Sequence, residues 1–183
     1  MNTDLLIVVD MQRDFISGAL GSAEAHAIVP AVAARIRRAK EEGTAVVFTL
    51  DTHEEDYMTT REGRFLPVPH CIRGTEGWTL EPEIAKECAR GMLSFEKPTF
   101  GSTALAHHVA ALAIDKGAIE GKGMTVELCG VCTDICVVSN AMLIKAALPE
   151  LDMVVDSALC AGVTPNKHEA ALETMRSCQI QVL

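Results

Sequence analysis

The 183-residue sequence lacks any hydrophobic run that could cross a bilayer, which requires about 20 consecutive apolar residues. The run over residues 5–9 is too short, and the nearly uncharged run over residues 129–144 is interrupted by Asp134 and by small polar residues. No basic region precedes the first apolar run and no small-residue cleavage site follows it, so we expect no secretory signal. The sequence therefore predicts a cytoplasmic protein without a membrane partner.

Clustered positive charge is also lacking. The formal net charge is −9 at pH 7, and the one basic cluster, residues 35–38, is typical of a solvated helix face. Because phosphate contacts need clustered Lys and Arg, we expect no nucleic-acid partner. The seven cysteines are odd in number and are scattered rather than set out as a disulfide framework, which predicts free thiols.

No repeat, low-complexity stretch or linker divides the chain, so residues 1–183 are expected to form a single domain. Apolar runs of strand length alternate with segments of helical period, which is typical of α/β proteins. The expected strands cover residues 5–9, 44–50, 92–95, 124–129, 151–155 and 179–183. The first expected helix starts near Ala25 and is closed by Gly43, and further helices are expected to begin near Pro82, Ser102, Thr133 and Pro165. This order predicts a doubly wound, six-stranded parallel sheet with helices on both faces, a Rossmann-like three-layer sandwich.

Active sites in such sheets lie beyond the carboxyl ends of the strands. Asp10 follows the first expected strand, Asp51 the second, Lys97 the third, and residues 130–136 the fourth. We therefore expect these segments to face one crevice. A polar loop over residues 51–79 is longer than a compact fold needs for a connection, and such loops are usually functional.

Cys136 is the candidate nucleophile. Thr133 is expected to cap the helix that follows, which would place Cys136 in the first helical turn and lower the pKa of its thiol. The alternative is a buried structural cysteine. Asp10 follows five apolar residues, so desolvation should raise the pKa of its carboxyl group and suit it to be a general base, although a loop cap is the alternative. Lys97 would supply a cation that favours the thiolate, although most lysines are merely solvated.

The long loop carries a candidate metal site. Asp51 and His53 are two apart at a strand end and so point to the same side, and His70 could close the site, with Glu62 as a further ligand. Two histidines and a carboxylate leave open positions for water or substrate, which is typical of catalytic metal sites. Histidines in a polar surface loop are the alternative. The candidate cofactor is a divalent metal, with zinc first and iron or manganese as alternatives.

The segments 5–15 and 130–137, together with Lys97, resemble the cysteine hydrolases of the isochorismatase-like superfamily. Asp51-Thr52-His53, Pro69-His70-Cys71 and Gly74-Thr75 resemble the nicotinamidases within that superfamily. The resemblance implies Asp10 as base, Lys97 as cation and Cys136 as nucleophile. It also implies a cis peptide at Val131–Cys132 and an oxyanion hole formed by the backbone N–H groups of Cys132 and Cys136.

The chain departs from many members of this superfamily at two positions. Cys132 stands where many have a small residue such as Ala. Phe100 stands where Tyr often follows the lysine motif, so any polar contact that a phenol would make to substrate is missing. Phe15 matches an aromatic that packs against the substrate ring. Trp78 and Val131 are further expected substrate contacts. Glu62 is a weaker metal-ligand prediction than His53 or His70, because the metal ligand beyond the Asp-x-His pair and the later His varies among members of the superfamily.

The resemblance implies a metal-dependent amidohydrolase that converts nicotinamide to nicotinate and ammonia through a thioester on Cys136. A metal-independent amidase of another small amide and an isochorismatase-type vinyl-ether hydrolase are the alternatives on the same fold. A non-enzymatic reading, with Cys132 and Cys136 as a redox or zinc-binding thiol pair, is disfavoured by their C-x₃-C spacing. The expected partner is a small-molecule amide, and a homo-oligomer is left open.

Overall fold

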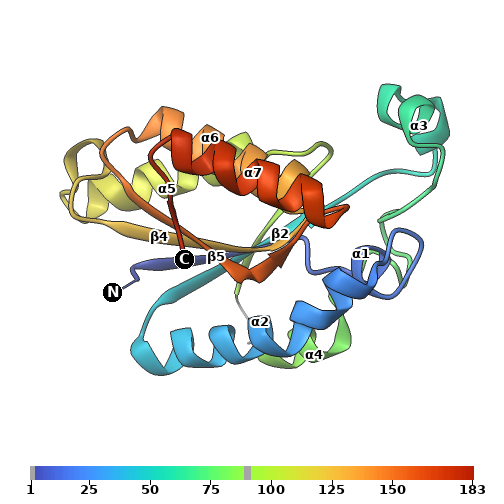
Figure 1. Ribbon diagram of the computed structural model, residues 1–183, viewed down its shortest axis with the longest axis horizontal. Coiled ribbons are helices and arrows are strands. Elements are labelled where there is room, and N and C mark those ends of the chain that lie inside the picture. The colour runs from blue at the N-terminus through green and yellow to red at the C-terminus, as the bar shows by residue number, and fades with distance from the viewer. Residues whose placement is uncertain (1–2, 89–91) are drawn as a thin grey trace.

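A computed structural model describes residues 3–88 and 92–183. Its centre is a parallel six-stranded sheet with the order β3-β2-β1-β4-β5-β6 (Figure 1). The strands are β1 (Leu5–Val9), β2 (Ala45–Asp51), β3 (Leu93–Lys97), β4 (Thr125–Val131), β5 (Asp152–Ala161) and β6 (Gln181–Val182). The order reverses on either side of β1, which confirms the predicted doubly wound sheet.

Helices cover both faces of the sheet, which gives three layers. The helices α2 (Ala23–Glu42) and α4 (Pro82–Glu87) lie on one face, and α5 (Thr103–Asp115), α6 (Val138–Ala147) and α7 (Pro165–Ser177) lie on the other (Figure 1). Shorter elements are α1 (Arg13–Ile16), η1 (Tyr57–Thr59), α3 (Arg61–Phe65), η2 (Ile119–Gly121) and η3 (Thr133–Val137). Within the described residues, no helix combines the length and the apolar character needed to span a membrane.

The central strand and the first long helix form as their sequences predict. All five residues of β1 are fully buried, because the strand has neighbours on both sides and helices on both faces. The helix α2 begins after Ser22, whose hydroxyl oxygen accepts a hydrogen bond from the Ala25 N–H, and ends at Gly43 in the left-handed conformation. Local capping signals thus set the limits of α2.

Three local expectations need correction. The last strand is only two residues long, Gln181–Val182. The loop after β2 is not structureless, because it contains η1 and α3. Thr133 does not cap a helix: the chain enters a π-helical turn, η3, with Cys132 at its N-cap and no side-chain cap, and the Thr133 hydroxyl instead hydrogen-bonds His168 Nδ1 at 2.8 Å. That bond is long-range, so local sequence does not reveal it.

Gly130 in β4 lies so close to the neighbouring strand β1 that no side chain fits between them. Its φ is 115°, and a Cβ atom built there would lie 2.1 Å from the carbonyl oxygen of Val9 in the neighbouring strand. A side chain at this position would therefore strain the backbone and push β1 and β4 apart.

Gly130→Ala should lower the free energy of unfolding by more than about 4 kcal/mol or prevent folding, because the clash is with backbone at the centre of the sheet. The control is Gly43→Ala, at a helix end with φ 74° and no atom within 4 Å of the added Cβ. The control should cost only about 1–2 kcal/mol. Denaturant unfolding measures both, and equal losses would contradict the steric argument.

Candidate active site

The carboxyl ends of four neighbouring strands bring the candidate residues together. Asp10 follows β1, Asp51 ends β2, Lys97 ends β3, and Cys136 lies in η3 just after β4. All four side chains are buried, Lys97 at only 1% exposure. The four segments were expected to face an open crevice. Their side chains instead form a buried cluster of charged groups and a thiol, and Lys97 is almost fully enclosed.

Lys97 is at the centre of this cluster. Its Nζ lies 2.7 Å from Asp10 Oδ2, 3.1 Å from Asp51 Oδ1 and 3.4 Å from Cys136 Sγ. Burial alone would lower the pKa of Lys97, but the negative charges of Asp10 and Asp51, and that of Cys136 when its thiol ionises, outweigh burial and raise it. The ammonium therefore stays charged and can stabilise an anion on any of its three neighbours.

Asp10 has the environment of a proton acceptor. Its backbone turns through φ 48° at the end of β1, and its Oδ1 accepts a 2.6 Å hydrogen bond from the Thr49 hydroxyl. Burial raises the pKa of the Asp10 carboxyl, and this effect exceeds the opposing attraction of Lys97. A carboxylate with a raised pKa is a stronger base than an exposed one, as the sequence predicted.

The expected lowered pKa of Cys136 is wrong. Burial raises the pKa of the thiol well above its ordinary value, and the neighbouring carboxylate of Asp10 adds to the rise, while the charge of Lys97 opposes it. The π-helical turn around Cys136 carries no side-chain cap, and desolvation outweighs the helix dipole at so buried a position. The thiol is therefore protonated at rest and needs a base beside it.

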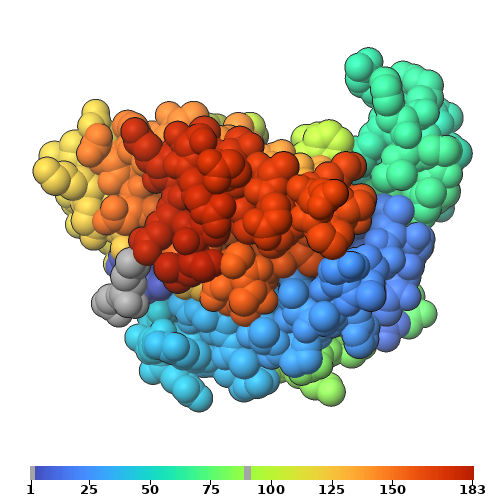
Figure 2. Space-filling model, in the orientation of Figure 1, coloured from blue at the N-terminus to red at the C-terminus, as the bar shows by residue number. Residues whose placement is uncertain are grey.

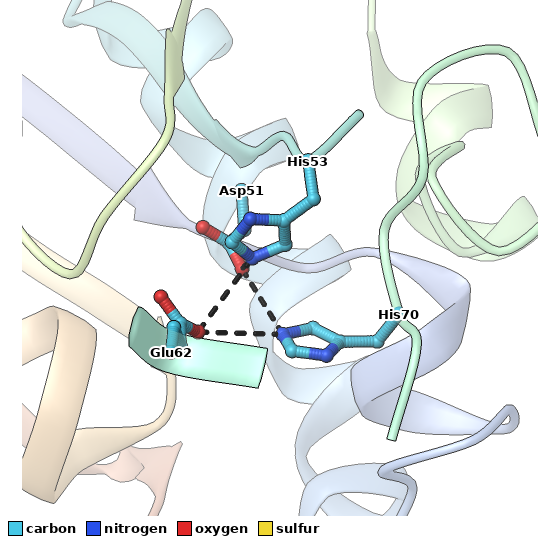
Figure 3. Close-up of side chains that lie close together, drawn as sticks. All are labelled: Asp51, His53, Glu62 and His70. Carbon is cyan, nitrogen blue, oxygen red and sulfur yellow. Dashed lines mark hydrogen bonds and ion pairs between the residues drawn. The ribbon is translucent and has the colours of Figure 1, made fainter. Parts of the chain in front are cut away.

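A second cluster adjoins the first. The carboxylates of Asp51 and Glu62 and the imidazoles of His53 and His70 point toward one another (Figure 3). His53 Nε2 lies 3.1 Å from Asp51 Oδ2 and 3.6 Å from Glu62 Oε1. The corresponding distances from His70 Nε2 are 3.5 and 3.8 Å. Glu62 comes from α3, whereas the other three come from the end of β2 and the loop that follows.

These four side chains fit a divalent metal. Four atoms that each bind zinc at about 2.0–2.2 Å in a tetrahedron lie roughly 3.3–3.6 Å from one another. The four distances given above are close to this range, and all four ligand atoms lie within 4.8 Å of one another. The Nδ1–H of His70 donates to the Val68 carbonyl at 2.8 Å, which leaves Nε2 free to face the site. Although burial would raise the pKa of Asp51, hydrogen bonds from His53 and His70 lower it, so the carboxylate is ionised.

A cavity of about 1110 Å³ opens beside both clusters. Its wall includes His53, Glu62 and Lys97, and it extends past Phe100 to Phe65 at the end of α3. Figure 2 shows the α3 segment standing out from the body of the molecule, with the surface hollowed between the two. A small ligand can therefore reach Lys97 and two of the candidate metal ligands, His53 and Glu62, from the same side.

The residues expected to contact substrate are dispersed. Phe100 lines the cavity, but Phe15, Val131 and Trp78 are not part of its wall. Phe15 packs edge-on against His70 with ring centroids 5.5 Å apart, and Val131 is fully buried before the cis peptide to Cys132. Trp78 lines a separate hollow, and its indole Nε1–H donates to Thr52 Oγ1 at 2.9 Å.

Two supporting residues were missed in the sequence. Tyr57 is almost fully buried, and its ring lies 4.6 Å from that of His53 and 5.0 Å from that of His70. The amide of Asn140 donates to the Cys136 carbonyl at 2.8 Å and accepts from the Ser102 N–H at 2.9 Å. The spacing of four between Cys136 and Asn140 was a usable signal, whereas nothing local marks Tyr57.

Comparison with known proteins places the chain in a family. A model of the isochorismatase domain matches residues 4–183. The chain belongs to the isochorismatase family. None of the curated proteins searched matches this chain.

Several solved structures share the fold over nearly their whole length. A pyrazinamidase of Pyrococcus horikoshii in complex with zinc is 30% identical, with a TM-score of 0.79 and coverage of 98% of this chain and 97% of that one. A nicotinamidase/pyrazinamidase from Bacillus subtilis is 28% identical, with a TM-score of 0.81 and coverage of 98% of both chains. An N-carbamoylsarcosine amidase from Thermoplasma acidophilum, at 24% identity, TM-score 0.75 and coverage of 98% and 95%, is similar in fold.

The family and these neighbours establish the general activity. The protein is an amidohydrolase of the isochorismatase family, acting on amide C–N bonds. The pyrazinamidase neighbour that holds zinc and the cluster of Asp51, His53, Glu62 and His70 together support a divalent metal.

Lys97→Met should shift the pH profile of Cys136 alkylation by iodoacetamide to higher pH. The substitution removes the positive charge that opposes the rise in the pKa of the thiol. Lys116→Met, which removes a half-exposed lysine paired with Asp4, is the control and should keep the wild-type profile. Mass mapping distinguishes Cys136 from the other cysteines, and an unchanged profile in Lys97→Met would exclude the role given to Lys97.

Proposed function

We propose that the protein is a zinc-dependent nicotinamidase that hydrolyses nicotinamide to nicotinate and ammonia. The observation that carries the proposal is the sharing of Asp51 between two clusters. One carboxylate oxygen lies 3.1 Å from Lys97 Nζ in the acid–lysine–thiol cluster, and the other lies 3.1 Å from His53 Nε2 in the metal cluster. A ring held at the metal cluster would therefore present its amide to Cys136.

The chain supplies each step of amide hydrolysis. Asp10 takes the thiol proton of Cys136, and Lys97 stabilises the resulting thiolate. The sulfur then attacks the amide carbonyl, and the backbone N–H groups of Cys132 and Cys136 receive the oxyanion. Asp10 returns its proton to the nitrogen, so the C–N bond breaks and ammonia leaves. Water activated by Asp10 hydrolyses the thioester, which releases the carboxylic acid and restores the thiol.

The metal ligands would serve to orient the substrate. Asp51, His53, His70 and Glu62 would hold the ion, and zinc bound there would supply a Lewis-acid position for the pyridine nitrogen. Phe15, Phe100, Trp78 and Val131 stay proposed substrate contacts. Phe100 is the one of these four that lines the cavity, and Trp78 would act only from outside it.

Two other activities on this fold are less well supported by the site. Hydrolysis of a vinyl ether needs neither a thiol nor a metal, so it would leave Cys136 and the four-ligand cluster without a role. An amidase for aliphatic amides would use Asp10, Lys97 and Cys136 but would not need a ligand for a ring nitrogen. The buried, convergent donor set therefore favours a heteroaromatic amide.

The setting of this activity is also a proposal. Nicotinate is a precursor for NAD salvage, and the seven thiols, all free, suit a reducing cytoplasm. We propose a single domain over residues 1–183 with a small-molecule amide as partner.

Removal of the metal should weaken substrate binding more than the covalent steps. Chelation or His53→Ala should raise KM for nicotinamide by about tenfold or more, since loss of even an outer-shell partner of a metal costs about 10–100-fold. Added zinc should restore the chelated enzyme but not the variant. His107→Ala, on the exposed side of α5, is the control. Full activity in metal-stripped protein, measured by ammonia release, would exclude the metal role.

The two neighbouring thiols should differ sharply. Cys136→Ala removes the nucleophile, so kcat should fall by about 10⁴ or more. Cys132→Ala keeps the backbone N–H and should retain most of kcat. Intact-mass measurement during turnover should place any acyl adduct on Cys136. An inactive Cys132→Ala beside an active Cys136→Ala would show that the nucleophile is misassigned.

A further inference from the structure

Gln12 is a fully buried amide that belongs to neither cluster, yet it binds the residue that both clusters share. Its Nε2 donates to the Asp51 carbonyl at 2.8 Å, and its Oε1 accepts from the Asp51 N–H at 2.7 Å. The side chain thus takes both backbone hydrogen bonds of Asp51, as a neighbouring strand would. It does so two residues after Asp10, at the point where β1 has ended.

The second proton of the same amide nitrogen binds the end of the long loop. Gln12 Nε2 also donates to the Trp78 carbonyl at 2.8 Å, and the indole of Trp78 donates to Thr52 Oγ1 at 2.9 Å. Asp51 and Thr52 are therefore held from two sides, by Gln12 directly and by Trp78 through its ring. Both amide protons and one lone pair of the Gln12 oxygen are used, so no rotation of the amide preserves these contacts.

The backbone of Asp51 must be held because its carboxylate has two demanding partners. One oxygen lies 3.1 Å from Lys97 Nζ and the other 3.1 Å from His53 Nε2. A displacement of this backbone by a fraction of an ångström cannot be corrected by side-chain rotation, because rotation toward one partner moves the other oxygen away. The position of the backbone therefore sets both contacts at once.

We infer that Gln12 is a positioning residue. By holding the backbone of Asp51, it fixes the position of one Asp51 carboxylate oxygen relative to the other metal ligands and of the other oxygen relative to the Lys97 ammonium beside Cys136. The metal part of this inference rests on the proposed function. Gln12 does not line the cavity, so its effect is exerted through Asp51 and not by contact with the substrate.

The test is Gln12→Leu, which leaves a branched apolar side chain one atom shorter than that of Gln and removes all three hydrogen bonds. Zinc affinity, measured by competition with a chromogenic chelator, should weaken by about 10–100-fold, as for other outer-shell partners of a metal. Alkylation of Cys136 by iodoacetamide at a fixed pH should also slow, because Lys97 loses its alignment with Asp51. Gln12→Asn, which keeps an amide one methylene shorter, is the variant to use if Gln12→Leu does not fold, and it should change both readouts in the same direction.

Thr44→Val is the matched control. The Thr44 hydroxyl donates to the Thr3 carbonyl at 2.9 Å just before the opposite end of β2, so its loss removes a buried hydrogen bond far from the site. The control should lower the Tm without changing zinc affinity or alkylation. A Gln12 variant that lowers the Tm but leaves both readouts at wild-type values would overturn the inference.

The outcomes separate this inference from the proposed function. If wild-type protein binds no zinc or releases no ammonia from nicotinamide, the proposed function fails. The inference is then decided by alkylation of Cys136 alone: slower alkylation in the Gln12 variants supports it, and an unchanged rate overturns it.

Discussion

The structure depends on one buried cation held between two carboxylates. Lys97 has been taken out of water and can remain charged only because Asp10 and Asp51 lie within 3.1 Å of its Nζ. Those three residues end or follow three adjacent strands, so the register of β3, β2 and β1 decides whether the charges meet. The alignment of these strands therefore determines the positions of the reacting groups. The thiol of Cys136 joins them from η3, which follows β4.

Much of this arrangement was predictable from sequence because parallel sheets obey strong geometric rules. An apolar run followed by Asp10, a second followed by Asp51 and a third followed by Lys97 place their polar residues at one edge of the sheet, whatever the details of packing. The metal ligands followed from a similar local rule, the two-residue period of a strand between Asp51 and His53. His70 and Glu62 were candidates by residue type alone, and the resemblance to known hydrolases strengthened the prediction for His70, since nothing in the spacing of a long loop fixes where it folds back.

What the sequence did not predict depends on contacts between distant residues. The pKa of Cys136 was expected to be lowered by a helix start, but desolvation and Asp10 act in the opposite direction, and both effects depend on tertiary packing. Thr133 has a strong capping propensity, yet its hydroxyl bonds His168 on α7. Trp78 was expected to contact the substrate, but it does not line the cavity, and its indole donates to Thr52, which does. Composition identifies an unusual residue but not its neighbours.

The sheet and the α3 segment contribute different parts of the site, so the substrate range of the enzyme can change without a change in its reacting groups. The reacting groups lie on strand ends and in η3, whereas α3 contributes one metal ligand, Glu62, and apolar side chains such as Phe65 at the outer end of the cavity. A substitution or insertion confined to residues 61–66 can therefore change the shape of the outer end of the cavity. The alignment of Asp10, Lys97 and Cys136, which depends on the strand ends and η3, would stay the same. This segment is where a library for altered substrate range should be built, with Glu62 retained as the anchor.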